Sequence, residues 1–167
     1  MQLDFKMNKE KLHIYMTLRS LLSNRFLLIA FIISISFFAR SQEATLAAVS
    51  NQSGAPSQMK LSELKSVFLG ETQRWKNGNR VIIALMKTNT SIGKTTSARL
   101  YEMSGDELNK FWLALVFQGK AQPPNFFSSA SELENFVAQN PGAIGILDKP
   151  IPGSEIKSII VDGQKTF

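Results

Sequence analysis

The sequence predicts an α/β fold in which a mostly parallel sheet is flanked by helices. Four short apolar runs, at 45–50, 81–86, 143–147 and 157–161, have the length and composition of buried strands. Segments with apolar residues three and four positions apart lie between them and are typical of amphipathic helices. Because strands and helices alternate along the chain, we expect parallel connections within one sheet.

Each strand is bounded by residues typical of turns. The run at 45–50 reads TLAAVS and is followed by NQSGAPS. The run at 80–86 reads RVIIALM, and its nearly continuous apolar character predicts a strand covered on both faces. AIGIL follows Asn140-Pro141-Gly142, and IKSIIV completes the set.

Four helices are expected between the strands, at 60–70, 95–103, 105–119 and 131–140. The third carries an apolar stripe with helical spacing, which we interpret as core rather than as a cofactor platform. Ser131 and Glu134 have the spacing of a capping box, which would start the fourth helix. Trp75 and Trp112 are expected in or near the core.

The composition excludes several kinds of chemistry. The chain has 167 residues, no cysteine, and a single histidine, His13. Disulfides, thiolate nucleophiles, Cys-ligated metals and a lipoprotein anchor are therefore excluded. If the N-terminal segment is removed, no Ser-His-Asp triad can form. We expect no enzymatic activity, no cofactor and no metal site.

The net charge of +6 is concentrated at the N-terminus. Residues 1–41 contain six basic and two acidic residues, so residues 42–167 carry a net charge of only +2. The basic balance therefore belongs mostly to the first segment and does not indicate a nucleic-acid partner.

Residues 1–41 have the features of a secretory signal. The run at 26–39 is apolar and uncharged over 14 residues, shorter than the about 20 residues of a spanning helix. Arg25 precedes this run, and Ala39-Arg40-Ser41 provides small residues for cleavage before Gln42. We expect a periplasmic domain at 42–167 that is not a lipoprotein and meets the membrane only through the signal. Met16 is the expected true start, and an uncleaved signal anchor is the alternative.

The stretch TNTSIGKTTSA, residues 88–98, follows a predicted strand and contains Gly93-Lys94-Thr95. A nucleotide-binding loop has this order, with a glycine five residues before the second glycine. Thr88 stands at that first position, so the phosphate-wrapping turn is not favoured. The alternative is a helix start, where unpaired N–H groups and a partial positive charge receive an anion.

Three motifs resemble the periplasmic phosphate-binding proteins of ABC transporters. They are LSELKSVFLGETQRWKNGNRV from Leu61, FWLALVFQGKAQPP from Phe111, and NPGAIG from Asn140. Their order and spacing cover roughly residues 44–167, and the nearer resemblance is to the small single-lobe proteins related to that family. The resemblance implies a single lobe of the type 2 periplasmic-binding-protein fold and a phosphate or related oxyanion as ligand.

The resemblance places the ligand site at the start of the helix after 81–86. Small members have a Ser-x-Ile-Arg run here; aligned on Ile92, the serine becomes Thr90 and the arginine becomes Gly93. We expect the N–H groups of residues 93–96 to face the anion, aided by hydroxyl groups and by the Lys94 charge. The candidate oxyanion-binding residues are Thr90, Ser91, Gly93, Lys94, Thr95 and Thr96.

Two functions remain open from the sequence. The first is an exported solute-binding-like module that binds an oxyanion weakly or assists phosphate uptake, with an envelope or ABC-transporter protein as partner. The second is an interaction module of the cell envelope whose ligand site has eroded. At 90–96, plain helix capping explains the threonines as well as anion binding does.

The signal assignment predicts the behaviour of one double variant. Replacing Ile29 and Ile32 by Asp places two charges in the apolar run, which opposes membrane insertion. We expect the variant to accumulate in the cytoplasm, as measured by cell fractionation, whereas Ile29→Leu with Ile32→Leu is exported. Normal export of the Asp variant would contradict the assignment.

Overall fold

The computed structural model describes residues 45–151, 153 and 155–167. The predicted signal segment, Met16 and the cleavage site lie outside the described residues. The described residues belong to one compact unit, Ala44–Phe167.

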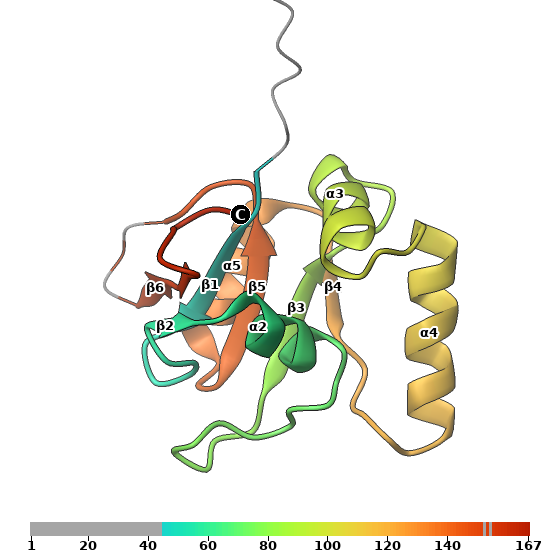
Figure 1. Ribbon diagram of the computed structural model, residues 1–167, viewed down its shortest axis with the longest axis horizontal. Coiled ribbons are helices and arrows are strands. Elements are labelled where there is room, and N and C mark those ends of the chain that lie inside the picture. Colours follow the sequence, from blue (N-terminus) through green and yellow to red (C-terminus); the bar gives the residue numbers. More distant parts are fainter. Residues whose placement is uncertain (1–44, 152, 154) are drawn as a thin grey trace, which may run out of the picture. The chain divides into compact units, whose positions relative to one another are not determined.

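A five-stranded sheet forms the centre of this unit, in the order β4-β3-β5-β1-β6 (Figure 1). Its strands are β1 (Ala47–Asn51), β3 (Ile82–Met86), β4 (Asn125–Phe127), β5 (Ala143–Leu147) and β6 (Ile156–Ser158). β3 is parallel to both β4 and β5, whereas β1 is antiparallel to β5 and β6. A second sheet pairs β2 (Gln58–Met59) in parallel with β7 (Ile160–Val161).

The expected α/β class with a mostly parallel sheet is confirmed, with three differences in the strands. The predicted strand at 157–161 is divided into two, because β6 pairs with β1 whereas β7 pairs with β2 in the second sheet. β2 and β4 were not predicted. β4 has only three residues and lies at the edge of the sheet. It therefore lacks the length and the continuous apolar run by which a buried strand is predicted from sequence.

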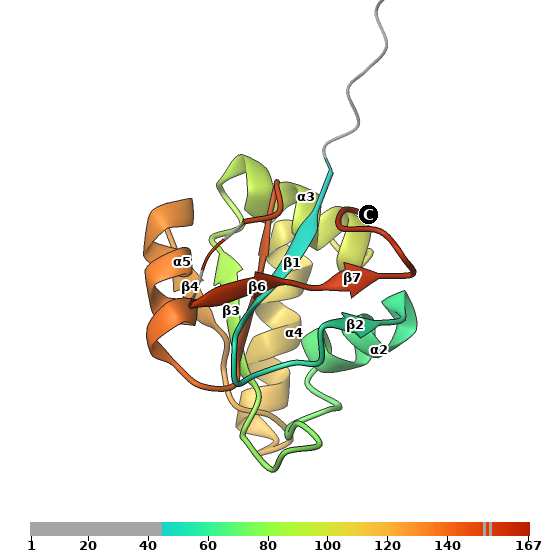
Figure 2. The ribbon, with the colours of Figure 1, turned by 90° about the vertical axis from the view of Figure 1, so that its left-hand side faces the viewer.

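Four helices cover the central sheet: α2 (Leu61–Phe68), α3 (Ser91–Leu100), α4 (Gly105–Phe117) and α5 (Ala130–Gln139). α5 lies on one face, and α2 and α4 lie on the other (Figure 2). All four predicted helices are present. α3, however, begins at Ser91 rather than at the predicted Thr95.

Alternate residues of the strands enter two separate cores. Ile83 and Leu85 of β3 join the core beneath α2, α3 and α4, whereas Ala84 and Met86 join the core beneath α5. This period of two explains why β3 (IIALM) is apolar throughout, since both faces of the strand are covered. Trp75 and Trp112 are buried in the first core, as predicted.

Serine side chains cap the N-termini of two helices, α4 and α5. Ser104 accepts a hydrogen bond from the Glu107 amide, and the Glu107 carboxylate accepts one from the Ser104 amide at 2.8 Å. This bond holds the pKa of Glu107 below its ordinary value. The capping box predicted at Ser131 is wrong: Ser129 caps α5, accepting from the Glu132 amide.

An asparagine closes the other end of α5. The side-chain amide of Asn51 donates to the carbonyl oxygens of Val137 and Ala138, at 3.1 and 2.8 Å. The last carbonyl groups of a helix have no partner within it, so the end of β1 supplies their hydrogen bonds. Burial of Asn51 is therefore compensated, and α5 is tied to the centre of the sheet.

The turn before β5 depends on Gly142. Its φ is +90°, and a Cβ at this position would lie 2.2 Å from the carbonyl oxygen of Arg80. The Gly142 carbonyl accepts hydrogen bonds from the Trp75 indole at 2.8 Å and from the Ile82 amide at 3.2 Å. One glycine thus joins the start of β3, the start of β5 and a core tryptophan.

The first and last described segments lie side by side. Leu46 and Phe167 exchange two backbone hydrogen bonds, of 3.0 and 2.9 Å, just before β1 begins. Figure 1 shows both segments near the carboxyl end of β5.

Gly142 gives the first structural prediction. Gly142→Ala combines an unfavourable positive φ with a clash against backbone, and we expect it to lower the free energy of unfolding by more than about 3 kcal/mol. Gly78→Ala is the matched control, because Gly78 has φ +87° but nothing within 4 Å of a new Cβ. We expect it to lose only about 1 kcal/mol in urea denaturation. Equal losses in the two variants would show that the close approach to Arg80 is unimportant.

Candidate functional site

The candidate site lies where the parallel strands end. The carboxyl ends of parallel strands meet at one edge of a sheet, and this edge is where ligands bind in open α/β folds. β3 ends here at Met86, and the loop 87–90 leads directly into α3 (Figure 1). The Lys87 amide donates to the Phe127 carbonyl at 2.9 Å, which ties the loop to the end of β4.

Gly93 allows α3 to begin close to the strand. A Cβ at position 93 would lie 2.0 Å from the Lys87 carbonyl oxygen, so no other residue fits without moving the backbone. Glycine thus permits a close backbone approach at this position, and the approach is made to the chain's own loop.

Thr90 is the N-cap of α3, and its hydroxyl group makes two hydrogen bonds. It accepts from the Gly93 amide at 3.0 Å and donates to the Lys87 carbonyl at 2.8 Å. The Lys94 amide donates to the Thr90 carbonyl. Thr90 therefore acts as a cap, which is one of the two roles that the sequence left open.

The unpaired donors of the helix start belong to Ser91 and Ile92. No hydrogen bond within the described residues uses their backbone N–H groups, and the first N–H groups of a helix have no partner inside it. The expectation that the N–H groups of residues 93–96 face a ligand is wrong for Gly93 and Lys94, whose amides are occupied. The reason is that α3 begins earlier than predicted.

The remaining predicted residues point in different directions. Ser91 and Lys94 are exposed beside the two open N–H groups. Thr95 donates its hydroxyl to the Ser91 carbonyl at 3.1 Å, as threonines inside helices do. Thr96 is buried, and its hydroxyl has no hydrogen-bond partner among the described residues, so it faces the core rather than the surface.

Some neighbours of the loop were not found from the sequence. The start of α4 packs against it, since a Cβ on Gly105 would lie 2.9 Å from the Thr88 Cβ. Thr45 donates to the Asp148 carbonyl at 3.2 Å, where β1 begins and β5 has ended. Asp148 and Lys149 follow β5 and are exposed. Thr88, Gly105 and Thr45 are far apart in sequence, so no local pattern links them.

The arrangement supports electrostatic binding of an anion. Two open N–H groups lie at the positive end of the helix dipole, and the exposed Lys94 follows in the same first turn of α3. Among the described residues, no group of three or more His, Cys, Asp or Glu side chains could hold a metal ion. Within the same residues, no helix combines the length and apolar character needed to span a bilayer.

A comparison with solved structures shows that the fold of this domain is similar to part of each of three longer chains. The first is an ABC-type phosphate transport receptor from Vibrio cholerae, with a TM-score of 0.57, 15% identity, and 74% of this chain and 49% of the receptor covered. The second is a putative phosphate ABC transporter substrate-binding protein with bound phosphate from Clostridium perfringens, with a TM-score of 0.54, 16% identity, and 72% and 47% covered. The third is PstS from Borrelia burgdorferi, with a TM-score of 0.52 and 14% identity. The match covers 72% of this chain and 49% of PstS.

This chain spans about half the length of these solved structures. At such low identity the likeness concerns the fold and not the ligand. No protein-family model matches the sequence, and no curated protein matches it.

The cap of α3 gives the second structural prediction. Thr90→Val keeps the shape of the side chain but removes the hydroxyl, so Gly93 loses its hydrogen-bond acceptor. We expect the free energy of unfolding to fall by about 1 kcal/mol, measured by urea denaturation. Thr90→Ser retains the hydroxyl and should lose less than half as much. A Val variant as stable as the wild type would show that the cap is dispensable.

Proposed function

We propose that this chain is an exported solute-binding-like module that binds phosphate or a related oxyanion weakly, or assists phosphate uptake, in the periplasm. The observation that carries the proposal is the pair of open N–H groups of Ser91 and Ile92 at the positive end of α3, with Lys94 one turn away. The likeness of the fold to three phosphate-transport proteins supports it.

The binding should be weak for two physical reasons. The Thr90 hydroxyl is already used as a cap, and Lys94 provides a point charge without the two-pronged geometry of an arginine. The described domain is also a single lobe, so an anion at this edge would stay partly hydrated unless a partner covered it. We expect a Kd on the order of 1 mM, or about 4 kcal/mol, that weakens as salt screens the charges.

The second candidate function is an interaction module of the cell envelope. It is favoured by the outer surface of α4, where Leu113 is 59% exposed and Phe117 is 83% exposed. Phe126, at the open sheet edge, is 36% exposed. Apolar groups gathered on a surface commonly mark a contact with another protein. We propose this function in place of the first if the domain does not bind phosphate in the titration described below.

The test of the anion site is a phosphate titration of the full chain followed by NMR. Ser91→Pro removes one open N–H, and proline is well tolerated at the first position of a helix. Thr90 has φ −83° and ψ 161°, the extended conformation that a residue before proline prefers. Ser91→Ala is the matched control, because it loses the hydroxyl and keeps the N–H.

We expect phosphate-dependent shifts centred on residues 88–95. Affinity should fall about fivefold in Ser91→Pro, since an N–H at a helix start contributes up to about 1 kcal/mol toward an exposed anion. Lys94→Ala should weaken binding about threefold, as exposed charge pairs do, whereas Lys110→Ala on α4 should not. Absence of shifts in this loop at about 50 mM phosphate, far above the expected Kd, would refute the anion site.

A further inference from the structure

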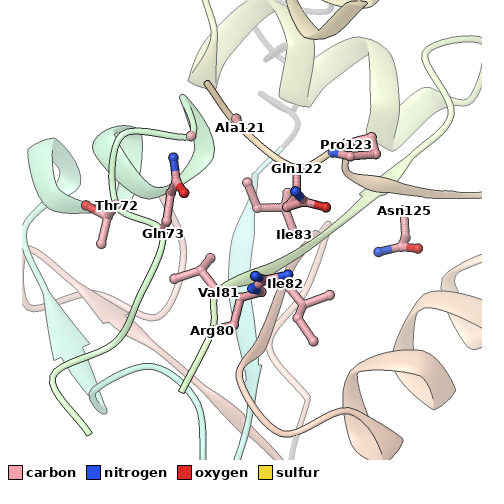
Figure 3. Close-up of a pocket in the computed structure, with 11 residues that line it drawn as sticks. Thr72, Gln73, Arg80, Val81, Ile82, Ile83, Ala121, Gln122, Pro123 and Asn125 are labelled. Atoms are coloured by element: carbon pink, nitrogen blue, oxygen red, sulfur yellow. The ribbon is translucent and has the colours of Figure 1, made fainter. Parts of the chain in front are cut away.

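A hollow with polar side chains around it lies at the other end of the parallel strands, where β3 and β4 begin. It has a volume of about 390 Å³, within the usual range for small-ligand pockets. Figure 3 shows its lining, which comes from the segment before β3, from β3 itself and from the segment leading into β4. The start of α3 lies at the other end of β3, so this hollow is separate from the site proposed above.

The floor of the hollow is apolar and fixed. Val81, Ile83 and Ala121 line it and are each less than a tenth exposed. Val81 donates its amide to the Gln73 carbonyl at 2.9 Å, and Gly142 packs against the Arg80 carbonyl. The backbone that carries the polar groups is therefore held in place before any ligand binds, which lowers the entropic cost of binding.

Three polar side chains around the hollow have no partner of their own. The guanidinium of Arg80 and the side-chain amides of Gln122 and Asn125 make no hydrogen bond or ion pair within the described residues. Gln73 donates its amide nitrogen to the Lys120 carbonyl at 2.5 Å, which leaves its amide oxygen available. Donors and acceptors therefore surround an apolar floor, as in a small-molecule site.

The surrounding charge is positive. The lining segment 70–83 contains three basic residues (Arg74, Lys76 and Arg80) and one acidic residue, Glu71, and residues 118–125 add Lys120. Arg74 is turned toward the Gly78 carbonyl, at 3.0 Å, so Arg80 is the cation that lines the hollow. A potential of this sign attracts anions and disfavours cations.

We propose that this hollow, lined by Arg80, Gln73, Gln122 and Asn125, binds a carboxylate group that carries a neighbouring hydroxyl or amide. The Arg80 guanidinium matches a planar carboxylate through two parallel N–H···O bonds. The three side-chain amides both donate and accept, so they suit a neutral polar group beside the carboxylate. The carbon atoms of the ligand would contact the apolar floor. Such a carboxylate comes either from a free hydroxy acid or from an acidic side chain of a partner protein.

The test uses two probes on the full chain, followed by NMR. One is L-malate, a free hydroxy acid, and the other is a capped tripeptide with a central aspartate. Arg80→Gln removes the guanidinium from an exposed side chain, and Arg80→Lys keeps the charge without the fork. Lys76→Gln is the control, because it lowers the net charge by the same amount outside the hollow.

We expect saturable shifts at residues 72–73, 80–83 and 121–125 with at least one probe. Arg80→Gln should weaken binding by about tenfold and Arg80→Lys by about threefold, whereas Lys76→Gln should stay within twofold. Tighter binding of malate assigns the site to a free acid, and tighter binding of the peptide assigns it to a protein partner. No saturable shift with either probe at about 50 mM, or equal binding by Arg80→Gln, overturns the proposal. Phosphate shifts at 88–95 are read separately, so failure at one site leaves the other unaffected.

Discussion

The position of β3 is held by two backbone contacts that only glycine permits. Gly142 approaches the Arg80 carbonyl just before β3, and Gly93 approaches the Lys87 carbonyl just after it. β3 lies between β4 and β5, and its alternate side chains enter both cores of the domain. Because protein interiors are close-packed, a shift of this strand would disturb the layers on both faces. The rest of the domain depends on these two contacts.

Both candidate sites derive their geometry from the same strand. At the carboxyl end, the Gly93 contact brings the first turn of α3 against the loop and orients its open N–H groups. At the amino end, the Gly142 contact fixes the backbone of Arg80, whose side chain lines the polar hollow. A rigid element that ends in loops is a common way to place binding groups, since the loops vary while the strand does not.

The sequence predicted the fold class and the central strands, because continuous apolar runs and helical spacing reflect burial directly. It failed where a choice depended on tertiary contacts. Ser129 and Ser131 both begin a Ser-x-x-Glu pattern, and the sequence alone does not distinguish the cap, which is Ser129. The start of α3 was placed too late because hydroxyl-rich residues are common in loops and at caps alike.

The polar hollow had no sequence signature. Arg80 and Asn125 line the same hollow because β3 pairs in parallel with β4, in which Asn125 lies opposite Ala84. The three-residue β4 follows Pro123-Pro124, which do not suggest a strand. The open helix start was partly predictable. The hydroxyl-rich stretch 88–98 indicated a helix start, but which amides stay unpaired depends on where α3 begins and on the Thr90 cap.

The two hydrogen bonds between Leu46 and Phe167 hold the first and last described segments next to each other. A domain with adjacent ends can be inserted into a loop of a host protein without stretching either connection. For the same reason, a short Gly/Ser linker could join Phe167 to Thr45 and allow new ends to be opened in an exposed turn such as 76–79. The domain is thus suited to circular permutation and to use as an insertable unit in engineered fusions.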